Sequence, residues 1–285
     1  MIRIKLLGDY LETAPHRDIS RRLHLSGGIL IAVIAVLLTL VFWDFEVDDA
    51  YIGYRIAENI ASGHGWVYNR GEQVNGATSP LWTLVLVVGA MAGSIIVVSH
   101  LATAACIFLV GYFAWRLSWH FLGPWLSLAA GVLIQTHPMM TLSITMETWL
   151  YLALALVSIW AWFNGRILIV GTCLSAVVLA RPDGIILAGI LFMFLWIQNR
   201  LSRLSVAVFL FPLVLWSLFS IWQFGNPLPQ TLEAKMAQAR SGFWDLAVPP
   251  VSFLPLFFKG LLWWLKHLHG IGVLLLILIL SIAGL

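Results

Sequence analysis

Apolar stretches alternate with short polar connections over most of the chain. The first apolar run extends from Gly27 to Trp43, and others lie near 81–98, 100–115, 123–136, 148–163, 167–180, 185–198, 204–222, 253–265 and 271–285. A helix rises about 1.5 Å per residue and a bilayer core is ~30 Å thick, so runs of this length predict membrane-crossing helices. We therefore expect an all-α polytopic membrane protein with about nine spans.

Composition supports this fold class. Hydrophobic residues make up 61% of the 285 residues and charged residues 10%, whereas a soluble domain carries about 25% charged residues. Basic residues are spread along the chain rather than clustered, which argues against nucleic acid as a partner.

The flanks of the first run predict its orientation. Residues 1–26 are polar and basic, and the run ends in WDFEVDDAY rather than in a small-residue cleavage site. We therefore expect a retained first helix behind a cytoplasmic N-terminal segment, because basic flanks stay in the cytoplasm. Asp48 and Asp49 then emerge on the outer face of the inner or plasma membrane.

The topology depends on the run 81–98. If this run crosses, the basic turns at Arg116, at 164–166 and at 199–203 lie outside. If it does not, all three lie inside and the acidic loops lie outside, as the loop-charge bias favours. Gly89 and Gly93 interrupt the run, which suits a helix at the membrane interface. A plain second span is the alternative. The first outer loop is then 44–98.

The first loop carries the candidate chemistry. Adjacent carboxylates resist ionising together unless a cation joins them, so Asp48 and Asp49 suit a divalent-metal site or a general base. Alternatively, they only solvate the helix end. Tyr51, Arg55 and Glu58 follow at helical spacing, which predicts one shared helix face.

Other charged residues stand at the ends of apolar runs. Glu147 begins a run, where it either caps a helix or supplies a second acid. Arg181 and Asp183, in ARPDG, form either a self-neutralising turn or part of an anion site. In 223–252, Lys235 and Arg240 either bind a lipid phosphate or snorkel to the interface. His64, between two glycines, is more typical of a loop residue than of a metal ligand, and we keep it as a candidate substrate contact.

Several segments, in this order, resemble the membrane-embedded GT-C glycosyltransferases. They are VDDAYIGYRIAENIASGHGWVYN with NGATSPLW, then TMETWLYLALAL, ARPDGIILA and FGNPLPQTLEAK. Their spacing looks like that of the AftB-type arabinofuranosyltransferase branch, over about Val41 to Lys235. Family members usually have more helices and often a soluble C-terminal domain, so we expect part of the protein to lie beyond this chain.

The resemblance implies a GT-C-like module over 27–285 with juxtamembrane helices in the first outer loop. It implies sugar transfer from a polyprenyl-phosphate donor to an envelope glycan, lipid or protein, with inversion. Asp48 and Asp49 would be the general base, the ligands of Mg, Mn or Ca, or both. No nucleotide cofactor is expected. The competing hypotheses are a lipid or sugar transporter or flippase, which usually shows broken helices and repeated halves, and a noncatalytic envelope scaffold.

Overall fold

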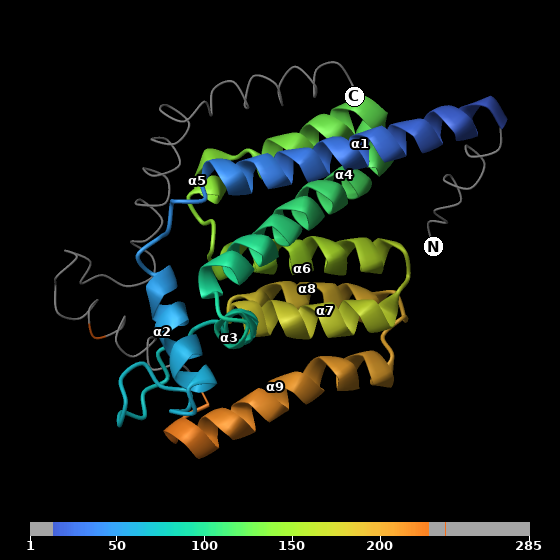
Figure 1. The fold of residues 1–285 in the computed structure, drawn as a ribbon. Helices are drawn as coiled ribbons and strands as arrows, with labels where there is room; N and C mark the ends of the chain where they lie inside the picture. The colour runs from blue at the N-terminus through green and yellow to red at the C-terminus, as the bar shows by residue number, and fades with distance from the viewer. Residues whose placement is uncertain (1–13, 228–236, 238–285) are drawn as a thin grey trace.

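The computed structural model describes residues 14–227 and Ala237, and within these residues all regular structure is helical. The helices, coloured along the chain in Figure 1, are α1 (Ala14–Val41), α2 (Ala50–Ala61), α3 (Pro80–Met91), α4 (Ile95–Gln135), α5 (Pro138–Thr141), α6 (Glu147–Phe163), α7 (Ile167–Ala180), α8 (Gly184–Ile197) and α9 (Arg203–Phe224). The runs predicted at 253–265 and 271–285 lie outside the described residues, as does nearly all of 228–252.

Helix α1 begins earlier than the apolar pattern predicts. It starts at Ala14, inside the segment 1–26 that we expected to be separate from the first span. Pro15 stands in its first turn, where the missing N–H costs nothing. The polar residues that follow contain no further helix breaker, so the helix continues into the apolar run.

Helix α4 consists of two antiparallel arms joined at Gly123, which adopts φ 69° and is followed by Pro124. The Gln135 side-chain amide donates hydrogen bonds to the backbone carbonyl oxygens of Ile107, at 2.9 Å, and Ile31, at 3.2 Å. Gln135 therefore ties the second arm to the first arm and to α1. The two apolar runs that we predicted pack side by side, but the chain reverses near Gly123 rather than at Arg116, because Gly123 supplies the left-handed conformation.

Helix α3 is set across the other helices. It has 12 residues, which gives a length of about 18 Å, well short of a ~30 Å hydrocarbon core. Figure 1 shows it nearly end-on, while α6, α7 and α9 run across the page. The break from α4 is at Gly93, with φ 88°, whereas Gly89 stays helical against Ile95 and Val98. The run 81–98 is thus a short transverse helix followed by the first turn of α4.

Four arginines gather at one end of the bundle. At one end, Phe121 packs on Phe163, and Arg200 lies against the turn at Gly165. This end carries Arg116, Arg166, Arg200 and Arg203. The opposite end, on the left in Figure 1, holds α2, α3, α5 and the first residues of α6 and α8. The arginines of the three predicted basic turns thus lie at one end of the described bundle, as both of the topologies that we considered predict.

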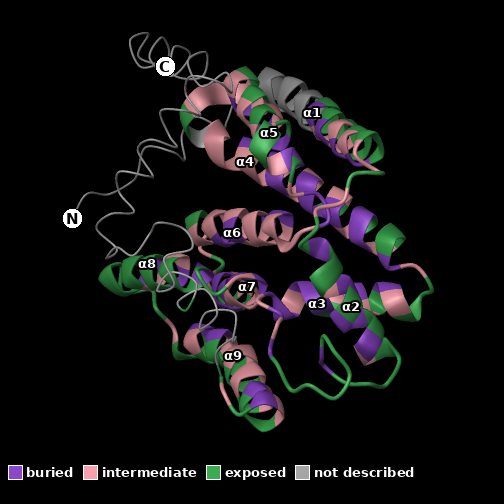
Figure 2. Ribbon diagram, turned by 90° about the vertical axis from the view of Figure 1, so that its left-hand side faces the viewer, coloured by how far each residue is buried: buried purple, intermediate pink, exposed green. Residues whose placement is uncertain are grey.

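Two helical segments, Ile95–Trp119 and Arg203–Phe224, are long and apolar enough to cross a membrane, and shorter apolar helices accompany them. Helices α8 and α9 expose large apolar side chains, among them Ile186 at 66%, Phe211 at 65% and Trp222 at 79%. Figure 2 shows exposed positions along both helices. Water-soluble proteins rarely expose such continuous apolar surface.

The contact between α7 and α9 depends on a glycine. An added Cβ at Gly171 would collide with the Ser205 carbonyl oxygen and approach Val208 Cγ2 to 2.9 Å, whereas Gly189 in α8 has open space. We expect Gly171→Ala to lower the free energy of unfolding by about 1–3 kcal/mol through overpacking. Gly189→Ala is the matched control, and thermal unfolding in detergent measures both. Equal melting temperatures for the two variants would contradict this packing.

Candidate active site

The carboxylates of the described chain beyond α1 gather at the end of the bundle opposite Arg116, Arg166, Arg200 and Arg203. The connection between α1 and α2, helix α2 itself, the loop 62–79 and the first turns of α6 and α8 all contribute. These carboxylates belong to Asp44, Glu46, Asp48, Asp49, Glu58, Glu72, Glu147 and Asp183. We call this region the acidic end.

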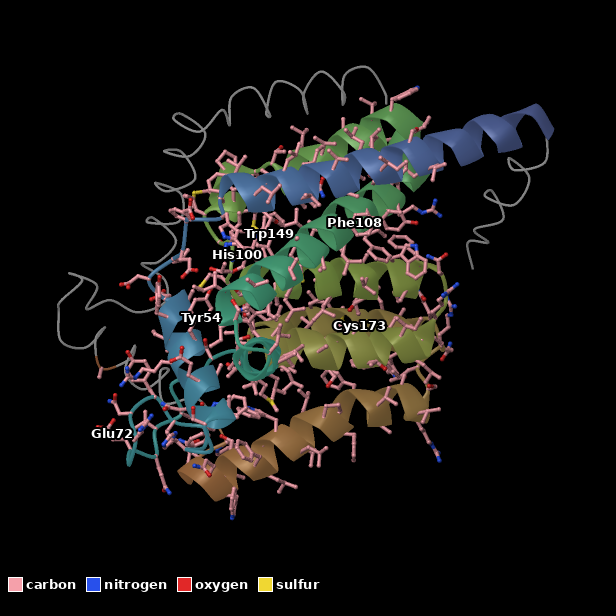
Figure 3. All side chains as sticks on the ribbon, viewed as in Figure 1. Tyr54, Glu72, His100, Phe108, Trp149 and Cys173 are labelled. Carbon is pink, nitrogen blue, oxygen red and sulfur yellow. The ribbon has the colours of Figure 1, made fainter. Side chains whose placement is uncertain are left out.

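Helix α2 has one buried and one open face. Ala50, Tyr54 and Ala57 pack into a cluster with Trp82 and Leu86 of α3. The Tyr54 hydroxyl lies 3.0 Å from Ser99 Oγ of α4, and Figure 3 shows the Tyr54 ring between these helices. Burial raises the pKa of Tyr54, and the hydrogen bond with Ser99 partly opposes the rise. The tyrosine therefore remains a neutral anchor for α2.

The open face of α2 lines a cavity of about 600 Å³. Tyr51, Arg55 and Glu58 contribute from α2, Tyr68 contributes from the loop, and the ends of α3 and α4 close the other side. The predicted shared face of Tyr51, Arg55 and Glu58 is confirmed. The spacing of three and four residues explains it, because such positions lie one above the other on a helix.

Arg55 is fixed at one side and open at the other. Its Nε donates a 3.0 Å hydrogen bond to the Tyr68 carbonyl oxygen, and its guanidinium carbon lies 5.3 Å from the centre of the Tyr68 ring. Within the described chain, no ion pair involves Arg55. A guanidinium held this way keeps its remaining N–H groups for an anion in the cavity.

A second cavity of about 400 Å³ adjoins the first. It is lined by Trp43, Asp44, Glu46, Tyr51 and Ile96, and Tyr51 and Ile96 also line the larger cavity. The pKa of Tyr51 is raised, mainly by the nearby Glu46 carboxylate, with a smaller contribution from the charge of Asp48. Tyr51 thus stands where the two cavities meet.

Asp48 and Asp49 lie beside these cavities, at the start of α2. Both side chains are exposed, and Asp49 occupies the N-cap position of α2 without a side-chain capping hydrogen bond. Their carboxylates are therefore not consumed by capping. Asp48 is close enough for its charge to act on Tyr51.

The described residues contain no group of three or more His, Cys, Asp or Glu side chains placed to hold one metal ion. Mg²⁺ often takes only one or two carboxylates together with substrate phosphate oxygens.

Glu147 and Arg181 form a second polar group. Arg181 Nη1 lies 3.4 Å from Glu147 Oε1, and Arg181 Nε lies 3.2 Å from Asp183 Oδ1. Glu147 is in the first turn of α6, where the helix dipole favours a carboxylate. Arg181 thus joins the α7–α8 turn to α6, and the self-neutralising turn that we considered includes Glu147 as well.

This ion-pair group is connected to α2 through packing. Met146, next to Glu147, packs against the cluster that contains Ala50 and Tyr54. Trp82 of α3 donates a 3.1 Å hydrogen bond to the Thr145 carbonyl oxygen. The two polar groups of the acidic end are therefore supported by the same buried residues.

The remaining candidate residues lie away from the two cavities or outside the described residues. His64 lies exposed in the turn after α2, between Gly63 and Gly65, and does not line either cavity. Lys235 and Arg240 lie outside the described residues. Conversely, Trp43, Asp44 and Glu46 line the smaller cavity but were not candidates, because WDFE reads as the polar end of an apolar run.

Comparison with known proteins gives one partial similarity. Over 81 residues, which are 28% of this chain, the sequence is 33% identical to the terminal beta-(1->2)-arabinofuranosyltransferase of Mycobacterium tuberculosis. The match spans 13% of the length of that protein. No family model matches the chain, and no solved structure matches it. Part of this chain is thus similar to a glycosyltransferase.

Proposed function

We propose that this chain is a GT-C-like membrane glycosyltransferase module whose reaction takes place at the acidic end. The observation that carries the proposal is the pair of adjoining cavities that meet at Tyr51 beside Asp48. One cavity offers a guanidinium for a phosphate, and the other offers carboxylates for hydroxyl groups. The partial similarity to an arabinofuranosyltransferase supports the same reaction class.

The proposed arrangement in the membrane follows from the two ends of the bundle. Helices α1, α6, α7, α8 and α9 and both arms of α4 cross the bilayer, with the arginine turns in the cytoplasm by the positive-inside rule. The acidic end then faces outward, and α2 and α3 lie at its surface. Spans of 14 residues, as in α7 and α8, are accommodated by local thinning of the bilayer.

The proposed donor is a sugar on a polyprenyl phosphate, whose tail stays in the bilayer and whose phosphate reaches Arg55. Asp48, or its neighbour Asp49, takes the proton of an acceptor hydroxyl while the hydroxyl oxygen bonds to the anomeric carbon. The bond from that carbon to the phosphate oxygen breaks, and its electron pair leaves with the polyprenyl phosphate. Arg55 offsets the charge that develops there. Attack opposite the leaving group inverts the anomeric configuration.

The direct test supplies the purified protein with synthetic polyprenyl-phosphate sugars and an envelope glycan as acceptor, with and without a chelator. We expect transfer from at least one donor, with inverted configuration by NMR. Loss of transfer on chelation would place a cation at Asp48 and Asp49 together with the donor phosphate. Absence of turnover with every donor, by protein that is folded in detergent, would refute the proposal.

A further inference from the structure

The smaller cavity differs in charge from the larger one. None of the five residues that line it is basic, and two of them, Asp44 and Glu46, are carboxylates. The larger cavity contains Arg55. A phosphate would be repelled by Asp44 and Glu46, since like charges at close range raise the energy of both. The smaller cavity therefore suits a neutral molecule that is rich in hydrogen-bond donors.

One wall of this cavity is the Trp43 ring, which packs against a buried histidine. The Trp43 ring centre lies 4.4 Å from the centre of the His100 ring, with 32° between the planes. His100 is fully buried, and its Nδ1 lies 2.9 Å from the Ile96 carbonyl oxygen. Figure 3 shows His100 at the start of α4, on the side of α1. His100 thus fixes the position of Trp43 relative to Ile96, another residue of the same wall.

Glu46 can accept hydrogen bonds from the hydroxyl groups of a molecule in this cavity. Its Oε2 atom is buried and has no hydrogen-bond partner among the described residues. A buried acceptor without a partner costs free energy. An ionised carboxylate only accepts hydrogen bonds, so the group that would satisfy Glu46 is a donor such as a hydroxyl. Asp44 and the Tyr51 hydroxyl offer further polar contacts in the same cavity.

We propose that the cavity of Trp43, Asp44, Glu46, Tyr51 and Ile96 binds the sugar residue of the acceptor. The C–H face of the sugar packs on Trp43, whose ring face carries partial negative charge, and its hydroxyl groups donate to Glu46 and Asp44. Because Tyr51 and Ile96 also line the cavity of Arg55, the acceptor hydroxyl lies next to the donor phosphate. This assignment rests on the proposed transferase function.

Binding and kinetics together test the acceptor site. Saturation-transfer NMR with a methyl arabinofuranosyl disaccharide, and with a mannosyl disaccharide for comparison, measures sugar binding to the detergent-solubilised protein. We expect Trp43→Ala and Glu46→Gln each to weaken binding at least tenfold, and Trp43→Phe to weaken it less. Trp125→Ala, at an exposed residue of α4, is the control and should bind as the unmodified protein does.

In transfer assays, Trp43→Ala and Glu46→Gln should raise KM for the acceptor at least five times more than KM for the donor. Equal effects on both KM values, or none, would overturn the acceptor site while leaving the transferase proposal intact. Binding that depends on Trp43 in a protein without transfer would refute the transferase function and retain a sugar site. Binding of neither disaccharide would overturn the site. Trp43→Phe and Glu46→Gln keep the test decisive where Trp43→Ala does not fold.

Discussion

Replacing Asp48 with Asn should lower the rate of sugar transfer by about 10²–10⁴-fold, the usual contribution of a general base. The asparagine amide is similar in size to the carboxylate but cannot take the proton from the hydroxyl group of the acceptor sugar. Asp48 is the stronger candidate of the pair because its charge reaches Tyr51, where the cavities meet, while Asp49 stands at the N-cap of α2. Initial rates with a synthetic polyprenyl-phosphate sugar measure the effect.

Glu72→Gln is the matched control for Asp48→Asn. Glu72 is an exposed carboxylate of the loop 62–79, where it accepts a hydrogen bond from Asn69 at 3.1 Å, and it does not line either cavity. Its amide variant should transfer sugar at the rate of the unmodified protein. If Asp48→Asn and Asp49→Asn both keep that rate of sugar transfer, neither aspartate is the general base.

Replacing Arg55 with Gln should lower kcat/KM for the donor by about 10–100-fold. A hydrogen bond to a charged group contributes about 1.5–3 kcal/mol, and the variant loses this contact with the donor phosphate. The kcat/KM of Arg55→Lys should lie between that of the unmodified protein and that of Arg55→Gln, since lysine keeps the charge but lacks the planar guanidinium. Steady-state kinetics at saturating acceptor separate the donor effect from any change in acceptor binding.

Arg70→Gln controls for net charge at the acidic end. Arg70 is exposed in the loop 62–79 and does not line the larger cavity. If Arg55→Gln and Arg70→Gln reduce kcat/KM equally, the effect comes from the overall electrostatic attraction of the donor, and Arg55 does not contact the phosphate.

Much of the fold could be predicted from local patterns. Helical periodicity placed Tyr51, Arg55 and Glu58 on one face, and the count of apolar runs placed the three predicted basic turns at one end. Both follow from interactions between near neighbours or from a simple count along the chain. The position of the reversal in α4 could not be predicted this way. Arg116 is polar and marked a plausible turn, but the backbone conformation at Gly123 decides where the chain turns.

The site itself was only partly predictable, because its contacts join residues that are far apart in sequence. Arg181 and Glu147 are separated by 34 positions, and no periodicity relates them. Trp43, in the turn after α1, depends on His100 of α4 for its fixed position. Asp44 and Glu46 resembled the solvated end of a span, and only the approach of Ile96 makes them line a cavity.

The grouping of Arg116, Arg166, Arg200 and Arg203 at the end of the bundle opposite the carboxylates has an electrical consequence. A bilayer that holds these helices upright would subject the two ends to different potentials. Carrying one elementary charge through a voltage of about 100 mV changes the free energy by about 2.3 kcal/mol. A resting cell, negative inside, would therefore stabilise the insertion that leaves Arg166, Arg200 and Arg203 on the interior side, and inverting the assembled bundle would be opposed by the voltage of the living membrane.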